Sequence, residues 1–307
     1  MSNLTPVTLD KLKTLLPEHK CKETNDWLGI REFGRATVFD LFYASKHGYT
    51  NIVHILLEDE IGLHLLAGDY APFGFHPLTI ASRNGHTATV IELLKAGADV
   101  HAFCHYDGQP EIALRKAAEN GHVTTVRVLL EYKANVHAGD HKIGTDRPDA
   151  ALRNAAAAGH TEVVRTLIQH KANLHACGRD GKLDIALRAA ASRGQTEVVR
   201  LLLRHKADVH ACGVDNKPDQ SLRWACLNNH LNTVELLLHS KANAQVLEED
   251  TLKSFANHCF SLGAGGTQLQ NLGFATRLRR PILQQIRNYD FQSLDQAFVS
   301  FDRILHS

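Results

Sequence analysis

The feature that most constrains the fold of this 307-residue chain is an internal repeat. The segment ALRNAAAAGHTEVVRTLIQHKANLHA at 151–176 returns 35 residues later as ALRAAASRGQTEVVRLLLRHKADVHA at 186–211. Weaker copies are found by aligning the short turn sequences HGY, NGH, AGH, RGQ and NNH, which follow one another at intervals of 35 to 38 residues. A period of this size predicts a stack of similar units, in which each unit contacts only its neighbours.

Each unit contains two short helical patterns separated by a turn. The first, IALRKAAEN at 112–120, is rich in alanine, so that another helix can approach it closely. The second, VTTVRVLLEY at 123–132, places Val126, Leu129 and Leu130 on one face at helical spacing. A helix of about ten residues is marginal in water when isolated. The units must therefore bury their apolar faces against one another.

The recurring order A-A-x-x-G-H-x-x-V-V-x-x-L-L-x-x-x-A-D/N-V-x-A resembles the ankyrin repeat, over roughly residues 39–246. The resemblance implies an all-α ankyrin-repeat solenoid of about six units with enlarged β-hairpin fingers, the first unit being degenerate and followed by an insert at 61–77. Residues 1–38 are predicted to form an N-terminal helix and lead-in. Residues 247–307 are predicted to form a helical C-terminal cap, or else a small helical domain.

The insert at 61–77, IGLHLLAGDYAPFGFHP, is rich in Leu, Phe and Tyr. Because the end unit of a solenoid exposes an apolar face, we expect the insert to cover the N-terminal end of the stack. A groove that accepts a partner is the alternative.

An arginine recurs near the start of the first helical pattern, and an acidic residue precedes it by four positions each time. The arginines are Arg115, Arg153, Arg188 and Arg223, and the acids are Glu111, Asp149, Asp184 and Asp219. We interpret the acids as helix N-caps and the arginines as a structural ladder that binds the next unit. Binding of ligand phosphates is the alternative. This ALR form of the repeat is similar to arrays of giant viruses and of amoeba-associated intracellular bacteria such as Legionella.

Lysine replaces the glycine that usually ends the second helix of the family, which this chain retains only at Gly97. The lysines are Lys133, Lys171, Lys206 and Lys241. The position favours a left-handed backbone, which costs a residue other than glycine about 1 kcal/mol. Either the turn is rebuilt or four residues accept the strain. Favourable charge near helix C-termini is our main explanation, and a basic row for an acidic partner is the alternative.

The fingers are longer than usual, and their tips differ while the scaffold repeats. Side chains that contact different parts of one partner would vary in this way, and binding loops are commonly held on rigid scaffolds. The predicted partner-binding residues are Phe103, His105, Tyr106, His141, Lys142, Arg179, Lys182, Val214 and Lys217. Solvated loops without a binding role are the alternative.

Twenty histidines raise the possibility of a metal site. Four belong to the Gly-His turns, and four more form a ladder where the family often has asparagine: His101, His137, His175 and His210. Side chains of stacked units run parallel and do not converge on one ion, so we predict no metal and no cofactor. Trp224 is interpreted as a core residue of the first helices, with ligand stacking as the alternative.

The charge balance bears on the partner class. The net charge is +1, which disfavours the broad basic surface that nucleic acid requires. No apolar run is long enough to insert in a membrane, and the N-terminus lacks the features of a secretory signal. We predict a cytoplasmic, monomeric, non-catalytic scaffold that binds a partner protein on the concave face of the solenoid and on the hairpin fingers, in host cytosol if the chain is a bacterial effector. An enzyme with its site in or beside the C-terminal segment and a self-assembling adaptor are the alternatives.

Overall fold

The structure is a computed structural model, and it describes residues 38–58, 76–102, 112–142, 145–147, 149–175, 185–212, 219–243 and 247. The predicted N-terminal helix, residues 61–75 of the predicted insert and the C-terminal segment after Leu247 lie outside the described residues. The last two residues predicted for the insert, His76 and Pro77, are the N-cap and the first residue of helix α6. The chain divides into two compact units, Met1–Asn173 and Leu174–Ser307, and each is described by itself.

Each of these two compact units contains several repeats, and each described repeat is a pair of helices joined by a tight turn. The first unit holds four pairs in its described part: α3 Val38–His47 with α4 Thr50–Glu58, α6 Pro77–Arg83 with α7 Thr87–Lys95, α8 Ile112–Glu119 with α9 Val123–Glu131, and α10 Ala150–Ala158 with α11 Thr161–Gln169. It also holds the strands β1 Asp140–Lys142 and β2 Thr145–Arg147. The described part of the second unit holds α12 Ile185–Ser192 with α13 Thr196–Arg204, and α14 Gln220–Leu227 with α15 Leu231–His239.

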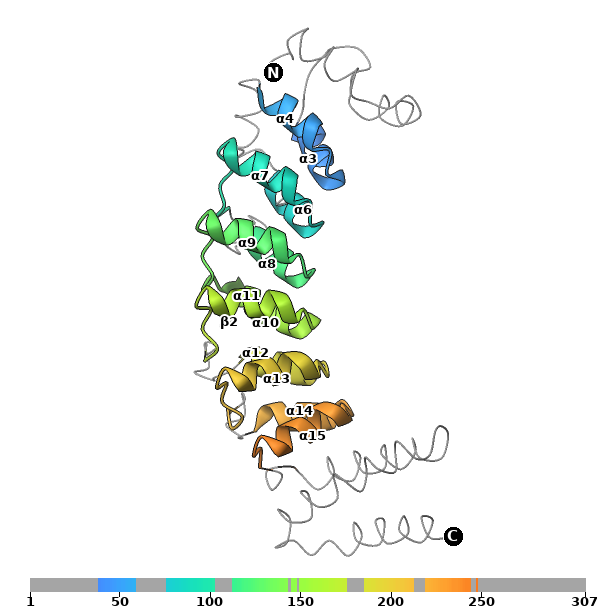
Figure 1. Cartoon of the computed structure of the whole chain (residues 1–307), viewed down its shortest axis with the longest axis vertical. Helices are drawn as coiled ribbons and strands as arrows, with labels where there is room; N and C mark the ends of the chain where they lie inside the picture. The colour runs from blue at the N-terminus through green and yellow to red at the C-terminus, as the bar shows by residue number, and fades with distance from the viewer. Residues whose placement is uncertain are drawn as a thin grey trace, which may run out of the picture. The chain divides into compact units, whose positions relative to one another are not determined.

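The helices of each unit form two layers (Figure 1). In the first unit the first helices α3, α6, α8 and α10 pack in chain order, and the second helices α4, α7, α9 and α11 pack beside them in the same order. In the second unit α12 packs on α14, and α13 packs on α15. The helix pairs and their stacking therefore confirm the arrangement that the repeat predicts.

Leucine and alanine fill the core between the layers. In each of the four pairs that carry the repeated arginine, the residue before it is a buried leucine. These leucines are Leu114, Leu152, Leu187 and Leu222, and they are at most 1% exposed. The alanines that face the neighbouring first helix are fully buried: Ala44, Ala81, Ala117, Ala155, Ala190 and Ala225. A leucine buried in this way contributes about 1.5–3 kcal/mol, and the alanines let the helix backbones approach closely.

The turn between the two helices of a pair is fixed by the next pair. The turn glycine has a positive φ, for example 78° at Gly121, and the histidine of the next turn lies against it. The Nε2–H of His160 donates to the carbonyl of Glu119 at 3.0 Å, near the end of the preceding first helix. The same bond joins His86 to Lys46 at 3.0 Å, His122 to Arg83 at 2.9 Å and His230 to Ser192 at 3.1 Å. We call this the Gly-His staple.

A second bond between pairs runs through threonine hydroxyls at the start of the second helices. Thr50 lies 2.9 Å from Thr89, Thr87 lies 2.8 Å from Thr125, and Thr196 lies 2.9 Å from Thr233, measured between their Oγ1 atoms. The later member of each pair is fully buried. A buried hydroxyl must find a partner, so these bonds fix the register of one second helix on the next.

The four lysines at the ends of the second helices have left-handed backbones, so the turn is kept and the strain is accepted. Their φ values are 69° at Lys133, 66° at Lys171, 67° at Lys206 and 71° at Lys241. The N–H of Lys133 bonds to the carbonyl of Leu130, and that of Ala134 bonds to the carbonyl of Leu129, both at 3.0 Å. This pair of bonds is the Schellman motif, which closes the helix although no glycine is present.

We predict that Lys133→Gly stabilises the first unit, because glycine adopts the left-handed conformation without the strain of a Cβ. The free energy of unfolding in urea should rise by about 0.5–1 kcal/mol, after allowance for the extra freedom of glycine in the unfolded chain. Lys116→Gly in the neighbouring helix α8 is the matched control, and should lower the same quantity by about 1 kcal/mol. A loss of stability in both variants would contradict the strained turn.

We predict that Gly121→Ala is more destabilising than Gly97→Ala. Both glycines have a positive φ, 78° and 92°, so both variants suffer backbone strain of about 1–2 kcal/mol. A Cβ at Gly121 would lie 2.6 Å from Nδ1 of His160, whereas a Cβ at Gly97 meets nothing within 4 Å. Gly121→Ala should therefore lose about 1–3 kcal/mol more in urea unfolding. Equal losses of stability in the two variants would show that the ring of His160 moves aside without an energetic penalty.

Candidate partner-binding surface

The base of one finger is closed by a buried aspartate. Asp149 follows the β1–β2 hairpin, has a left-handed backbone with φ of 53°, and is 3% exposed. Its Oδ1 accepts a bond from Nδ1–H of His137 at 3.1 Å and from the backbone N–H of Asn173 at 3.0 Å. His137 precedes the finger and Asn173 follows helix α11. One carboxylate thus joins three segments of the chain.

The same arrangement recurs in the second unit. Asp219 has φ of 53° and is 1% exposed. Its Oδ1 accepts from Nδ1–H of His210 at 3.0 Å and from the backbone N–H of Asn243 at 3.2 Å. The repetition of every partner shows that the bonds belong to the repeat. We call the Asp-His-Asn set the finger clamp, because it ties both ends of a finger to the end of the following pair.

The interpretation of these aspartates as capping side chains is wrong. Asp149 and Asp219 do occupy the N-cap positions of α10 and α14, but neither side chain caps its helix. The left-handed backbone turns the carboxylate toward the finger base, where the ladder histidine binds it. Glu111 and Asp184, the acids of the other two repeats, lie outside the described residues.

Burial sets the electrostatics of the finger clamp. It raises the pKa of Asp149 above the usual value for an aspartate, although the N–H of Asn173 and the ring of His137 act in the opposite direction. Burial raises the pKa of Asp219 as well, against the effects of the Asn243 N–H and of His210. The clamp therefore holds its charge at an energetic cost, which its hydrogen bonds only partly offset.

The finger between His137 and Asp149 contains an antiparallel hairpin. Asp140 pairs with Arg147, His141 with Asp146, and Lys142 with Thr145. His141 and Lys142 are thus placed on β1 by their backbone, and their side chains lie outside the description. The other predicted contact residues, Phe103, His105, Tyr106, Arg179, Lys182, Val214 and Lys217, also lie outside the described residues. Enlarged β-hairpin fingers, as a feature of every repeat, stay a prediction.

The repeated arginines occupy equivalent places on the first helices. Arg115 is buried at 6% exposure, and Arg153, Arg188 and Arg223 are half-buried. Arg153 donates from Nε and Nη2 to Oδ1 of Asn154, at 3.3 and 3.2 Å. Their role as a structural ladder that binds one repeat to the next stays a prediction.

The interpretation of Trp224 as a core residue is wrong. Its side chain is 43% exposed, and Leu227 on the same helix is 50% exposed. The buried residues of α14 are Gln220, Ser221, Leu222, Ala225 and Cys226. Trp224 directly follows the repeated arginine, where the other repeats carry Lys116, Asn154 and Ala189. The polarity of Lys116 and Asn154 is the signal that could have placed Trp224 at the surface.

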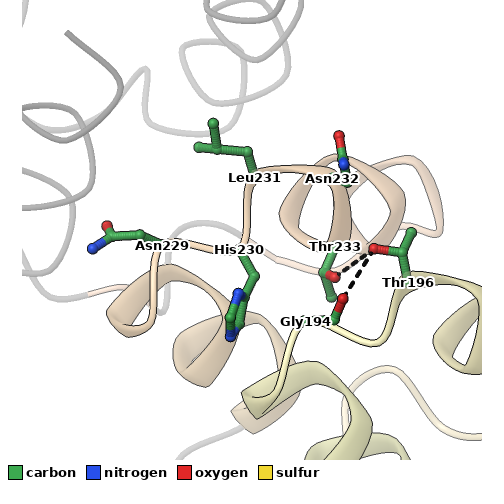
Figure 2. Close-up of a pocket in the computed structure, with 7 residues that line it drawn as sticks. All are labelled: Gly194, Thr196, Asn229, His230, Leu231, Asn232 and Thr233. Atoms are coloured by element: carbon green, nitrogen blue, oxygen red, sulfur yellow. Dashed lines mark hydrogen bonds between the residues drawn. The ribbon is translucent and has the colours of Figure 1, made fainter. Parts of the chain in front are cut away.

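A polar hollow of about 360 Å³ lies beside the turns of the second unit (Figure 2). Its lining consists of Gly194, Thr196, Asn229, His230, Leu231, Asn232 and Thr233. Thr196 is bonded to Thr233 and to the carbonyl of Gly194, and His230 forms the Gly-His staple with Ser192. Thr196, Thr233 and His230 of the lining therefore join one pair to the next, whereas the buried Oδ1 of Asn229 has no hydrogen-bond partner in the structure.

Two further findings concern the described residues. They contain no group of three or more His, Cys, Asp or Glu side chains placed to hold a metal ion. In the same part of the chain, none of the helices has the length and apolar character needed to cross a membrane.

Comparisons with known proteins agree with this architecture. The family model described as ankyrin repeats (3 copies) matches residues 41–142, 102–177 and 152–250, which together make up more than half of the chain. Among solved structures, the human ASB11 ankyrin repeat domain is similar in fold, with a TM-score of 0.55 and 21% sequence identity over 66% of this chain and 84% of that one. No curated protein matches the sequence.

We predict that Asp149→Asn changes how stability depends on pH. Because burial raises the pKa of Asp149, the folded chain keeps this proton to a higher pH than the unfolded chain. Between the two pKa values the folded state binds more protons, so the free energy of unfolding falls as pH rises and levels off above the folded pKa. Asparagine removes this loss, since it cannot ionise.

Urea unfolding between about pH 3.5 and pH 7 measures the effect. The stability of Asp149→Asn relative to the original chain should increase with pH through that window. Asparagine keeps an acceptor oxygen for both bonds and tolerates a left-handed backbone. Asp149→Ala is the control, because it also cannot ionise but loses both bonds, so its stability should run parallel to that of Asp149→Asn with pH and lie about 1–3 kcal/mol below it. If the free energy of unfolding of Asp149→Asn changed with pH in parallel with that of the original chain, this result would contradict the raised pKa of Asp149.

Proposed function

The protein belongs to the ankyrin-repeat family of protein-interaction scaffolds, and from this premise we propose that it binds a partner protein through the exposed face of its first helices and through its fingers. We further propose that the chain performs no chemistry of its own. The partner would be recognised by side chains on a framework that is already rigid before binding.

One observation carries this proposal. Along the first helices the buried positions repeat, whereas the position after the arginine changes in every pair. Its occupants are Lys116, Asn154, Ala189 and Trp224, which differ in charge, size and polarity. Folding requires the constant positions, because they form the core. It places no such demand on the variable position, so its diversity is what a surface that contacts different parts of one partner needs.

The Gly-His staple and the finger clamp support the same proposal. Each joins a flexible element, a turn or a finger base, to a neighbouring segment through hydrogen bonds. A binding surface that is ordered in advance loses less conformational entropy on association. These hydrogen bonds therefore fix the turns and finger bases that flank the first helices, on which the variable side chains lie.

Site-specific photo-crosslinking in an extract of the source cells tests the proposed function. A photoreactive amino acid is placed at the half-buried positions Lys116 or Asn154 on the first helices, and at the exposed positions Arg127 or Arg165 on the second helices as controls. We expect protein adducts from the first two positions and none from the controls. The double substitution Phe103→Ala with Tyr106→Ala should reduce the yield if the finger contributes. Equal adducts at all four positions, or none at any, would contradict the proposal.

The setting of this function is also a proposal. The similarity of the ALR repeats to those of amoeba-associated bacteria and giant viruses supports a cytoplasmic protein, and a role as a bacterial effector in a host cell. A monomeric state and the lack of nucleic-acid binding stay predictions from the sequence.

A further inference from the structure

Four exposed lysines share one strained position in the described repeats. Lys133 and Lys171 belong to the first compact unit, and Lys206 and Lys241 belong to the second. Their backbone N–H groups donate to carbonyls of the preceding helix at 2.9–3.1 Å and so close its last turn. Among the described residues, no carboxylate forms an ion pair with any of the four ammonium groups. The four charges are therefore available to a ligand.

Folding alone does not explain lysine at this position. Glycine adopts the left-handed backbone without strain, and asparagine tolerates it better than lysine does. A cation near a helix C-terminus is favourable, but it gains the same benefit in the last helical turn, where the backbone is unstrained. The last turns of α9 and α11 contain no basic residue, and α9 ends with Glu131. In these repeats lysine is kept at the strained position and not at the unstrained one, which indicates a role for its side chain outside folding.

The lysines lie beside the bases of the fingers. Lys171 is two residues before Asn173, whose N–H donates to Asp149 of the finger clamp at 3.0 Å. Lys241 has the same relation to Asn243 of the second clamp. Helix α9 packs on α11, and α13 packs on α15, so the two lysines of each compact unit lie at the same edge of neighbouring repeats. We call each pair the lysine edge of its unit.

The lysine edge of the second unit has further positive charge. The exposed cations at the ends of α13 and α15 are Arg204, Lys206 and Lys241. The acids nearest to them in the sequence are Asp208 and Glu235, which are half-buried. The carboxylate of Asp208 already accepts a backbone N–H at 2.9 Å. The exposed charge of this edge is therefore positive, which suits an anionic ligand.

We propose that each lysine edge binds an acidic, extended segment of the partner protein, with one carboxylate for each repeat. This inference rests on the proposed function and names the chemistry of the partner. Packed helices lie about 8–10 Å apart, so lysines of neighbouring repeats follow at about this interval. A segment in the polyproline II conformation advances about 9 Å in three residues and returns to the same face. An acidic residue at every third position therefore meets one lysine per repeat.

The spacing of the charges favours a polypeptide over a nucleic acid, the other common polyanion. The phosphates of each DNA strand follow at about 3.4 Å along the helix axis, which is much closer than one lysine per repeat. A single strand is bound largely by stacking of its bases on aromatic rings. The residue before Lys241 is Ser240, which offers no ring.

Fluorescence anisotropy with two synthetic peptides and the full-length chain tests the inference. The spaced peptide repeats Glu-Pro-Pro four times, and the clustered peptide has the same composition with its four glutamates together. Lys206→Asn with Lys241→Asn removes the lysines of the second edge, and Lys133→Asn with Lys171→Asn removes those of the first. Asparagine tolerates the left-handed backbone, so circular dichroism and urea unfolding should show that both double variants are folded.

Arg83→Gln with Arg193→Gln is the matched control. Both arginines are exposed, and they lie at the Gly-His turns, at the opposite ends of their helical pairs from the fingers. The control removes two positive charges from the chain, as each double lysine variant does. It therefore separates the effect of the lysine edge from that of the net charge.

We expect the spaced peptide to bind the original chain several-fold more tightly than the clustered peptide does. Its dissociation constant should rise about threefold to tenfold when the second edge is removed. The rise should be smaller for the first edge, because the exposed Glu131 lowers the positive charge there. The control should bind like the original chain, binding should weaken as salt is added, and poly-deoxythymidine should not compete.

Different results separate this inference from the proposed function. Equal binding of the two peptides, or a dissociation constant that neither double lysine variant changes, overturns the inference. Competition by poly-deoxythymidine that is lost in the lysine variants also overturns it, because the edges would then bind nucleic acid. Crosslinked adducts at the first helices without binding of the spaced peptide would leave the proposed function intact. The absence of adducts contradicts the proposed function whichever peptide binds.

Discussion

The contact of a histidine ring with the glycine of the preceding turn determines how closely one helical pair can follow another. A Cβ at the glycine would occupy the space of the ring, and the left-handed backbone already favours glycine there. The ring also satisfies a carbonyl in the last turn of a first helix, where the helix itself provides no partner. Spacing, register and hydrogen bonding between neighbouring pairs thus depend on the same two residues.

The exception in the second unit supports this account. Asn229, with φ of 58°, takes the glycine position in the last described pair. Among the described residues no later turn follows that would place a histidine against it. Asparagine tolerates the left-handed backbone better than most residues, so the conformation is kept here without glycine. The glycine is therefore needed for the neighbour as much as for its own turn.

The sequence predicted what depends on local spacing. The helix pairs follow from the repeat and from leucine periodicity. The alignment of the lysines with Gly97 located the turn, but left open whether it is rebuilt or strained. The finger clamp could not be predicted in this way, because Asp149 finds its partners 12 residues earlier and 24 residues later in the chain. Spacing to Arg153 indicated a capping residue continuous with the helix, whereas the left-handed dihedral turns the carboxylate elsewhere. An aromatic side chain on the first helix predicted a core position for Trp224, although its counterparts Lys116 and Asn154 are polar.

The division between constant and variable positions explains how such a chain can hold a stable fold and a specific surface together. Substituting a constant position would affect a core contact and the neighbouring pair. The position after the arginine is half-buried or exposed and lies outside the core, and lysine, asparagine, alanine and tryptophan all stand there. An exposed tryptophan beside an exposed leucine contributes little to folding, since burial of apolar area is the source of that stabilisation. The same apolar area is available to a partner, and the packed helices hold it in position before the partner binds.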